Sequence, residues 1–351
     1  MTDSAQVRRL EYRPALDGIR CLAVLAVVMY HLGYTVFKGG YVGVDVFFVL
    51  SGYLITALLL LERESTGSIS LRGFFGRRVR RLAPSLVVVC ALVLVAYTID
   101  VSASQRTETL VGVPTALGYL TTWVLAFGWW GCGFMAHAWS LSVEETFYAI
   151  FPVAFVLLAR RFQPRWVFLA TAGAIVYYLA AGNLFDWDWE RIFHGPDTRA
   201  QQLLIGCSLA VALHRCRDVV PMVVKAVAAG IGIVVLVLWT FTVQDSSALY
   251  ADVGQLITAL AAVAILWFLV TAPASWLAKG LALAPLVWIG RRSYTVYLAH
   301  FPVIGLLEGQ RRVVMLVLVM SLSLAYAAVS YRVVELPFLR RRSTGASTGT
   351  A

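Results

Sequence analysis

Long apolar runs separated by short polar segments make up most of the chain. A helix needs about 20 apolar residues to cross a bilayer. Ten runs meet or approach that length: 20–37, 41–61, 84–100, 139–159, 166–182, 200–214, 219–241, 251–271, 285–306 and 313–334. The pattern therefore predicts an all-α fold, a polytopic integral membrane helix bundle of about ten transmembrane helices.

One further apolar stretch, 109–138, differs from these runs because it holds five glycines and Pro114. If it does not span and the N-terminus is cytoplasmic, all but six of the 29 lysines and arginines lie inside. If it spans, they divide almost evenly, so the positive-inside rule favours ten spans with cytoplasmic N- and C-termini. We therefore predict a re-entrant segment near 109–138, which needs a protein-lined or watery cavity around it. The six outer basic residues are Lys38, Arg106, Arg191, Arg199, Arg311 and Arg312.

The polar segments suggest a single domain. We predict a membrane domain over 1–340 and a disordered Ser/Thr/Gly tail over 341–351, with no cleaved signal peptide. Residues 62–83 read as a basic cytoplasmic loop, and residues 183–199 as an acidic, aromatic outer loop.

Composition excludes a soluble globular protein. The chain is 60% hydrophobic and 14% charged, with a mean hydropathy of +0.78; soluble domains are about 45–50% apolar and about 25% charged. The net charge of +10 lies in short clusters between apolar runs, which indicates membrane topology rather than nucleic-acid binding. Five scattered cysteines without a CxxC spacing predict neither a disulfide framework nor a metal site.

The first predicted span carries two ionisable residues, Arg20 and His31. His31 follows Arg20 by eleven positions, which is about 16 Å along a helix and places both on nearly the same face. Such residues are costly in a membrane, and each is a functional hypothesis. Arg20 could also be a topogenic charge, and His31 a hydrogen-bonded interfacial histidine. Histidine is nevertheless well suited to proton transfer near neutral pH.

Glycines dominate the start of the second predicted span. Gly39, Gly40 and Tyr41 are candidate acceptor-binding residues, because glycine lets a ligand or another helix approach closely. Tight helix packing is the alternative interpretation. Asp45, one turn into this span, needs a partner.

Three later segments also hold candidate functional residues. Arg77, Arg78 and Arg81 are either a positive-inside cluster or a phosphate site, since guanidinium groups bind phosphate in a bidentate way. Glu144 and Glu145 in the fourth predicted span are candidate catalytic carboxylates, although acidic residues also suit a helix N-terminus. Trp139 in the same span and His300, two residues before Pro302 in the ninth, are candidate substrate-binding residues.

Together these segments resemble the acyltransferase-3 family of integral membrane acyltransferases, in order and over nearly the whole chain. Leu16 to Arg20 with His31 is similar to the family's arginine–ten residues–histidine motif. The segments 40–55, 139–148 and 290–302 resemble its later blocks, and Arg77, Arg78 and Arg81 its cytoplasmic arginine motif. Ala138, Ala299 and the short segment 102–136 depart from the family pattern.

The resemblance implies transfer of an acyl group, commonly acetyl, from acyl-CoA in the cytoplasm to a hydroxyl. Acceptors in this family are surface glycans, lipid-linked sugars and secreted small molecules such as macrolides. The short segment after the last predicted span leads us to expect the form of the family without an esterase-like domain. We expect the protein to lie in the cell membrane. The acceptor, the acyl chain length and the oligomeric state stay open.

The expected mechanism is direct transfer with no metal. Arg77, Arg78 and Arg81 hold the coenzyme A phosphates, and the pantetheine arm passes Arg20. His31 takes the proton of the acceptor hydroxyl, and one of Asp45, Glu144 and Glu145 supports it. A transient acyl-histidine is the alternative chemistry, and a proton-coupled membrane transporter is the alternative function.

Overall fold

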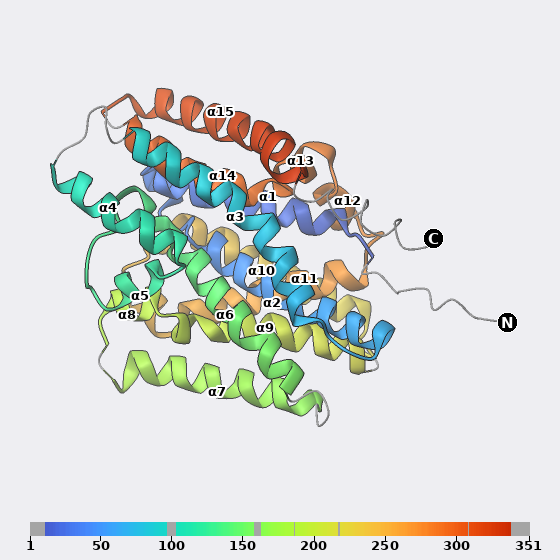
Figure 1. The fold of residues 1–351 in the computed structure, drawn as a ribbon. Helices are drawn as coiled ribbons and strands as arrows, with labels where there is room; N and C mark the ends of the chain where they lie inside the picture. The colour runs from blue at the N-terminus through green and yellow to red at the C-terminus, as the bar shows by residue number, and fades with distance from the viewer. Residues whose placement is uncertain are drawn as a thin grey trace, which may run out of the picture.

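The computed structural model describes residues 11–96, 103–157, 163–185, 187–216, 218–307 and 309–337, and the regular elements within these ranges are all helices. Figure 1 shows the long helices running side by side across the molecule. The expected tail, 341–351, lies outside the described residues.

Eight described helical segments are long and apolar enough to cross a membrane, which confirms the prediction of a polytopic, multi-pass bundle. They are α1 (Pro14–His31), α2 (Val42–Thr66), α3 (Leu71–Ala96), η2 with α6 (Gly133–Leu157), α7 (Pro164–Asn183), α10 (Met222–Thr242), η4 with α11 (Tyr250–Thr271), and α15 with η5 (Arg312–Glu335).

Two of the ten expected spans take a different form. Residues 200–214 lie in α9 (Pro196–Arg215), which is long enough but buries polar side chains, among them Arg199 and Gln202. Residues 285–306 form two helices, α13 (Ala284–Gly290) and α14 (Ser293–Leu306). These two segments therefore differ in form from the other eight: α9 carries buried polar side chains, which a helix packed inside a bundle can pair, and the chain turns at Arg291 and Arg292 between α13 and α14.

The segment 109–138 is not one long helix. It lies in α4 (Ala103–Leu117), α5 (Thr121–Ala126) and the 3₁₀ helix η2 (Gly133–Ala138). The chain takes a positive φ at Tyr119, Gly128 and Gly133, where these helices end or begin. Figure 1 shows α4 and α5 near α8 (Trp189–His194), together at one end of the bundle.

The expected basic loop 62–83 is mostly helical. α2 continues to Thr66, the chain turns at Gly67 with φ +72°, and α3 begins at Leu71. Arg77, Arg78 and Arg81 therefore lie on α3, and not in a loop. Their i, i+1, i+4 spacing places them on one face of that helix.

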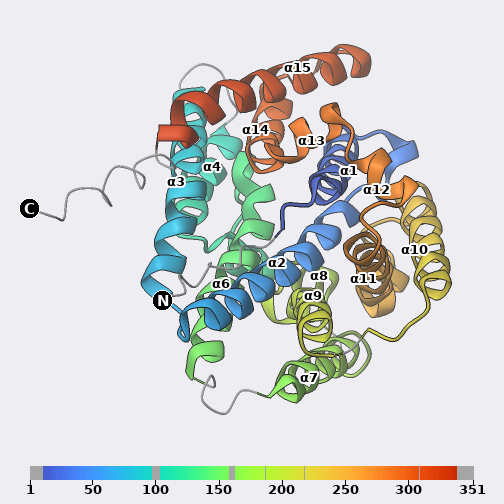
Figure 2. The same cartoon turned by 90° about the vertical axis from the view of Figure 1, so that its right-hand side faces the viewer.

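α2 lies at the centre of the bundle, in contact with α1, α6, α9 and α11 (Figure 2). Its glycines allow this close packing. A Cβ at Gly43 would lie 2.3 Å from the carbonyl oxygen of Ala23 in α1, and one at Gly52 would lie 1.9 Å from that of Leu203 in α9.

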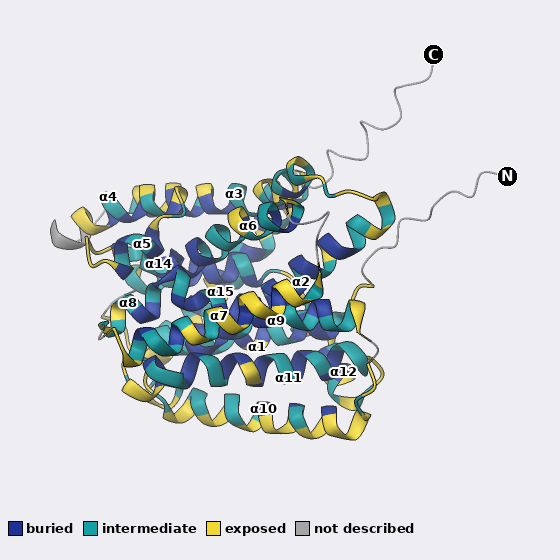
Figure 3. Cartoon of the chain, turned by 90° about the horizontal axis from the view of Figure 1, so that it is seen from below, coloured by how far each residue is buried: buried dark blue, intermediate teal, exposed yellow. Residues whose placement is uncertain are grey.

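The outer surface of the bundle is apolar, as a lipid-facing surface must be. On α10, exposed residues recur every three or four positions and form one stripe along the helix (Figure 3). A stripe of this size left in water would be an aggregation liability, whereas lipid covers it at no cost. The stripe consists of Val223, Val227, Ile231, Val234 and Leu238.

Candidate active site

A cavity of about 920 Å³ runs along α2, with α1, α3, α6 and α14 completing its walls. Its lining reaches from Val44 to Thr66 on α2, which is about 33 Å along a helix. Much of the wall is apolar. All four arginines predicted to bind the donor line this one cavity: Arg20, Arg77, Arg78 and Arg81.

The cavity has an excess of positive charge. Arg77 donates to Glu62 at 2.9 Å, and Arg20 donates through Nε to the Ser293 hydroxyl at 3.2 Å. The Arg78 guanidinium lies on the Tyr148 ring, 3.2 Å from its centroid. Glu62 and Glu144 are the acidic residues among the lining residues, so the four arginines are only partly neutralised. This favours an anionic ligand.

The two adjacent glutamates of α6 lie at this cavity: Glu144 lines it, and Glu145 contacts the lining residue Arg78. Glu144 accepts a hydrogen bond from the Ser51 hydroxyl at 2.6 Å. Glu145 faces the Arg78 guanidinium, with Oε1 3.7 Å from Nε. The expected contact of either carboxylate with His31 is therefore corrected: both pair with residues on α2 and α3.

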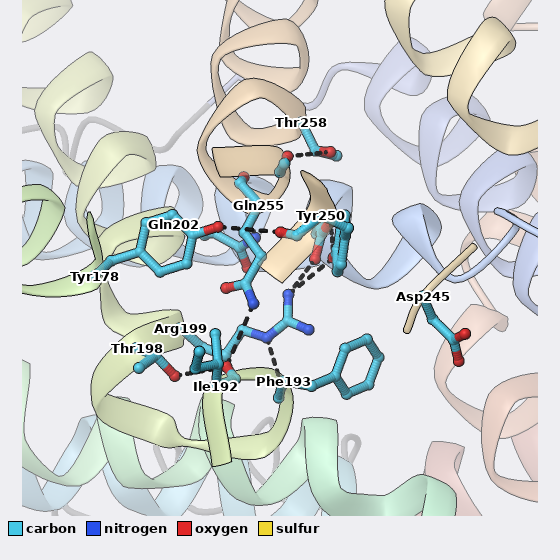
Figure 4. Close-up of polar contacts among 12 residues, drawn as sticks. Tyr178, Ile192, Phe193, Thr198, Arg199, Gln202, Asp245, Tyr250, Gln255 and Thr258 are labelled. Carbon is cyan, nitrogen blue, oxygen red and sulfur yellow. Dashed lines mark hydrogen bonds and ion pairs between the residues drawn. The ribbon is translucent and has the colours of Figure 1, made fainter. Parts of the chain in front are cut away.

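Asp45 also has a partner other than His31. Its carboxylate accepts hydrogen bonds from Arg199 Nη1 at 2.7 Å and from the Tyr250 hydroxyl at 2.6 Å. Arg199 also donates to the Phe193 carbonyl at 2.7 Å, and Figure 4 shows the guanidinium between Phe193 and Tyr250. Arg199 and Asp45 are each 1% exposed or less. The expected support of His31 by Asp45 is thus replaced by a buried ion pair that connects α2 to α9.

His31 lies in a cluster of three histidines. Its Nδ1 is 3.0 Å from Nε2 of His300, although 269 residues separate the two in the chain. The His137 ring centroid lies 5.4 Å from that of His300, and His137 Nε2 donates to the Leu298 carbonyl at 3.2 Å. His137 and His300 are buried, whereas His31 is partly exposed.

One layer of side chains separates the cavity from the histidines. Ser140 and Tyr297 line the cavity, and their hydroxyls are 2.7 Å apart. The Tyr297 hydroxyl donates to the backbone carbonyl of His137 at 2.8 Å. The Tyr297 carbonyl in turn contacts His300 Nδ1 at 2.5 Å.

Two of the residues predicted to bind the acceptor, Gly39 and Gly40, have no room for a ligand beside them, because backbone atoms of neighbouring helices fill the space next to their Cα atoms. A Cβ at Gly39 would lie 1.9 Å from the Trp239 carbonyl oxygen, and one at Gly40 2.2 Å from that of Ala26. This corrects their expected role as ligand-contacting residues in favour of tight packing. Tyr41 is buried, with its ring 4.6 Å from that of Tyr250.

Trp139 connects the cavity to the opposite end of the bundle. Its ring lies 6.1 Å from that of Phe48, which lines the cavity, and 5.1 Å from that of His194 in α8. Burial lowers the pKa of His194 to about 4, so this imidazole is neutral at physiological pH.

Sequence reasoning missed four residues that the structure places around the site. His137 precedes a motif that was recognised, and Tyr297 lies within another, so position alone could have suggested both. Arg199 and Tyr250 gave no such signal, because each lies in a segment with no recognised motif. In the part of the chain that the structure describes, no group of three histidine, cysteine or acidic side chains is arranged to hold a metal ion.

The fold and the cavity define a polytopic membrane protein with a cationic cavity that ends beside a histidine cluster. The chain belongs to the acyltransferase-3 family, whose acyltransferase domain matches residues 13–331. This confirms the resemblance found in the sequence motifs.

Named relatives agree with that assignment. The chain is 34% identical over 368 residues to O-acetyltransferase OatA of Staphylococcus aureus (strain NCTC 8325 / PS 47), which covers 97% of this chain and 60% of OatA. It is also 34% identical over 355 residues to SAS0844 of Staphylococcus aureus (strain MSSA476), likewise named for O-acetyl transfer, with 94% and 58% covered. The chain thus spans about 60% of the length of these relatives. No solved structure matches it.

Proposed function

We propose that this chain is a membrane-embedded O-acyltransferase that moves an acetyl group from acetyl-CoA to a hydroxyl of a sugar-containing acceptor. The observation that carries the proposal is the convergence of four arginines, from α1 and α3, on one cavity whose lining residue Tyr297 contacts His300, the partner of His31. The O-acetyltransferase names of the relatives support acetyl as the transferred group.

The cavity is chemically suited to an acyl-CoA donor. Its arginines would bind the coenzyme A phosphates, because guanidinium groups make charge-assisted, bidentate contacts with phosphate oxygens. Its apolar walls, among them Phe47, Phe48 and Leu54, would enclose the pantetheine arm and the acyl group. A volume of about 920 Å³ is typical of a site for one small molecule.

His31 would serve as the general base. Its imidazole takes the proton of the acceptor hydroxyl while that oxygen attacks the thioester carbonyl carbon. The tetrahedral intermediate then breaks its carbon–sulfur bond, and the imidazolium returns the proton to the departing thiolate. The products are an acetyl ester and free coenzyme A.

We infer that the arginine end of the cavity faces the cytoplasm. The turn after α2 lies beside the start of α3, where Arg72, Arg77, Arg78, Arg80 and Arg81 gather. The opposite end carries the acidic residues Asp188, Glu190 and Asp245, with the basic Arg191 among them. This asymmetry follows the positive-inside rule and would give donor access from the cytoplasm, with both termini on that side of the cell membrane.

The activity test uses purified protein in liposomes with radiolabelled acetyl-CoA. We expect wild-type protein to transfer label to an acceptor and His31→Ala to be inactive. Unimpaired transfer by a normally inserted His31→Ala variant would reject the proposed role of His31. Label that stays on the protein before acceptor is added would indicate an acyl-histidine in place of direct transfer.

The acceptor itself can be found by mass spectrometry of surface glycans and secreted metabolites. Cells with and without the protein should differ by the mass of one acetyl group on a hydroxylated compound. A proton-coupled transporter would leave acetyl-CoA unconsumed, and membership in an acyltransferase family argues against that function.

A further inference from the structure

The immediate partner of His31 is another histidine. Nδ1 of His31 and Nε2 of His300 are 3.0 Å apart. Two imidazole nitrogens can form a hydrogen bond only if one carries a proton and the other a lone pair. The contacts of His300 decide which nitrogen donates.

The second nitrogen of His300 determines its tautomer. His300 Nδ1 lies 2.5 Å from the carbonyl oxygen of Tyr297. A carbonyl oxygen can only accept, so Nδ1 of His300 must carry a proton. In a neutral ring the remaining nitrogen, Nε2, then has a lone pair and accepts. The proton in the pair therefore belongs to His31 Nδ1.

A neutral pair is the favoured state in these surroundings. His300 has no exposed surface, and a second proton would place a buried positive charge there. The titratable rings nearby are His137, whose centroid is 5.4 Å from that of His300, and Tyr30, 5.0 Å from His31. The carboxylates expected at this position are bound elsewhere, to Arg199, Ser51 and Arg78.

We propose that His300 is a positioning residue that holds His31 in its Nδ1-protonated tautomer, so that the Nε2 lone pair of His31 is the base in acyl transfer. The inference rests on the proposed function. His300 thus takes the place of the carboxylate that accepts a hydrogen bond from the catalytic histidine in many enzymes. When Nε2 takes the acceptor proton, the Nδ1–H···Nε2 hydrogen bond stabilises the resulting imidazolium.

Two substitutions of His300 separate its two hydrogen bonds. The carboxamide of His300→Gln reaches the former position of Nε2 and keeps an acceptor for His31. The carboxamide of His300→Asn ends near the former position of Nδ1, so it keeps the Tyr297 contact but no longer offers an acceptor to His31 Nδ1. Both replacements are uncharged and polar, which makes them a matched pair.

We expect kcat of His300→Asn to fall at least roughly tenfold below that of His300→Gln, by analogy with the loss of other orienting hydrogen bonds. KM for acetyl-CoA should stay unchanged, because the donor cavity is intact. The limb of the kcat/KM profile that reports the base should move to lower pH in His300→Asn, since the imidazolium loses its acceptor. A merely structural role would not produce rescue by glutamine or a shifted limb.

Equal kcat values and unshifted profiles for the two variants, with His31→Ala inactive, would overturn this inference and leave the proposed function standing. Activity in His31→Ala would overturn the proposed function instead. A measurement on wild-type protein covers the case in which a variant does not fold. NMR of ¹⁵N-histidine-labelled protein, with His31 assigned by comparison with His31→Ala, should show protonated Nδ1 and unprotonated Nε2. The opposite tautomer would reject the proposal.

Discussion

Each arginine in the cavity is held differently, and this determines how much of its charge is left for a ligand. Arg77 bonds Glu62, and Arg78 lies between the Tyr148 ring and Glu145. Arg81 lines the cavity one turn further along α3. Arg80, between them in sequence, is not among the lining residues and supplies a control with the same charge.

We predict that replacing both Arg77 and Arg81 with glutamine weakens coenzyme A binding by roughly 10- to 100-fold. Hydrogen bonds to charged groups contribute about 1.5–3 kcal/mol each, and the neighbouring arginines offset part of the loss. Isothermal titration in detergent measures the affinity. Arg80→Gln should bind as the wild type does. Equal affinity in all three proteins would mean that the cluster serves topology alone.

The buried ion pair of Asp45 and Arg199 is expected to stabilise the folded protein. Asp45→Asn leaves the guanidinium of Arg199 without its counter-charge in a site with no exposed surface. We expect a loss of about 3–5 kcal/mol in the free energy of unfolding, as when other buried pairs lose one partner. Thermal unfolding in detergent reports the change.

The double variant Asp45→Leu with Arg199→Met should recover much of that stability, since an apolar pair of similar volume needs no counter-charge. If Asp45→Asn were as stable as the wild type, the ion pair would not hold α2 to α9. Loss of acyl transfer without any loss of stability would instead assign Asp45 to the chemistry.

At the scale of elements, the spacing between helices depends on glycine. α2 and α9 approach each other through Gly52 and Gly206, and a Cβ on either would lie within 2.0 Å of a backbone oxygen on the other helix. The hydrophobic pattern predicted these two helices but could not show that they are neighbours, because packing depends on which faces meet.

We predict that Gly52→Ala destabilises the protein by roughly 1–3 kcal/mol, the usual cost of overpacking a close contact. The melting temperature in detergent should fall. Gly173→Ala in α7 is the matched control, since a Cβ there meets nothing within 4 Å and alanine favours helix. A melting temperature for Gly52→Ala as high as that of Gly173→Ala would contradict the observed contact.

The ends of the helices do not coincide with the ends of the apolar runs. The arginine motif was expected in a loop because its charges interrupt the apolar pattern, yet it lies inside the continuous helix α3, which begins at Leu71. Hydropathy detects which part of a helix lies in lipid, but hydrogen bonding continues beyond it. In α9, likewise, Arg199 and Gln202 lower the hydropathy of a helix that is packed inside the bundle.

At the scale of the whole molecule, the two ends of the bundle differ in charge. The arginine end lies beside the turn after α2, and the histidine cluster lies near the start of α2, at the other end of the cavity. Donor and acceptor would therefore approach from opposite sides of the membrane. The exposed apolar surface between the two ends is the part that lipid covers.

Single cysteines at Ser68 and Ser246 test this orientation. Ser68 follows α2, Ser246 follows α10, and both are exposed. In intact cells carrying an otherwise cysteine-free protein, a membrane-impermeant maleimide should label Ser246→Cys and leave Ser68→Cys unlabelled until the membrane is opened. The reverse pattern would invert the proposed topology.

The sequence by itself determined that this is a polytopic helix bundle of the acyltransferase-3 family, and it selected the four arginines, His31 and His300 as candidate site residues. Hydropathy, local charge and motif order are properties of single segments, so one chain is enough to recognise them. Only the tertiary structure decided the partners of these residues. Asp45 meets Arg199 across 154 residues, and His31 meets His300 across 269. Contacts over such separations depend on how helices pack, and no local pattern records which helix faces which.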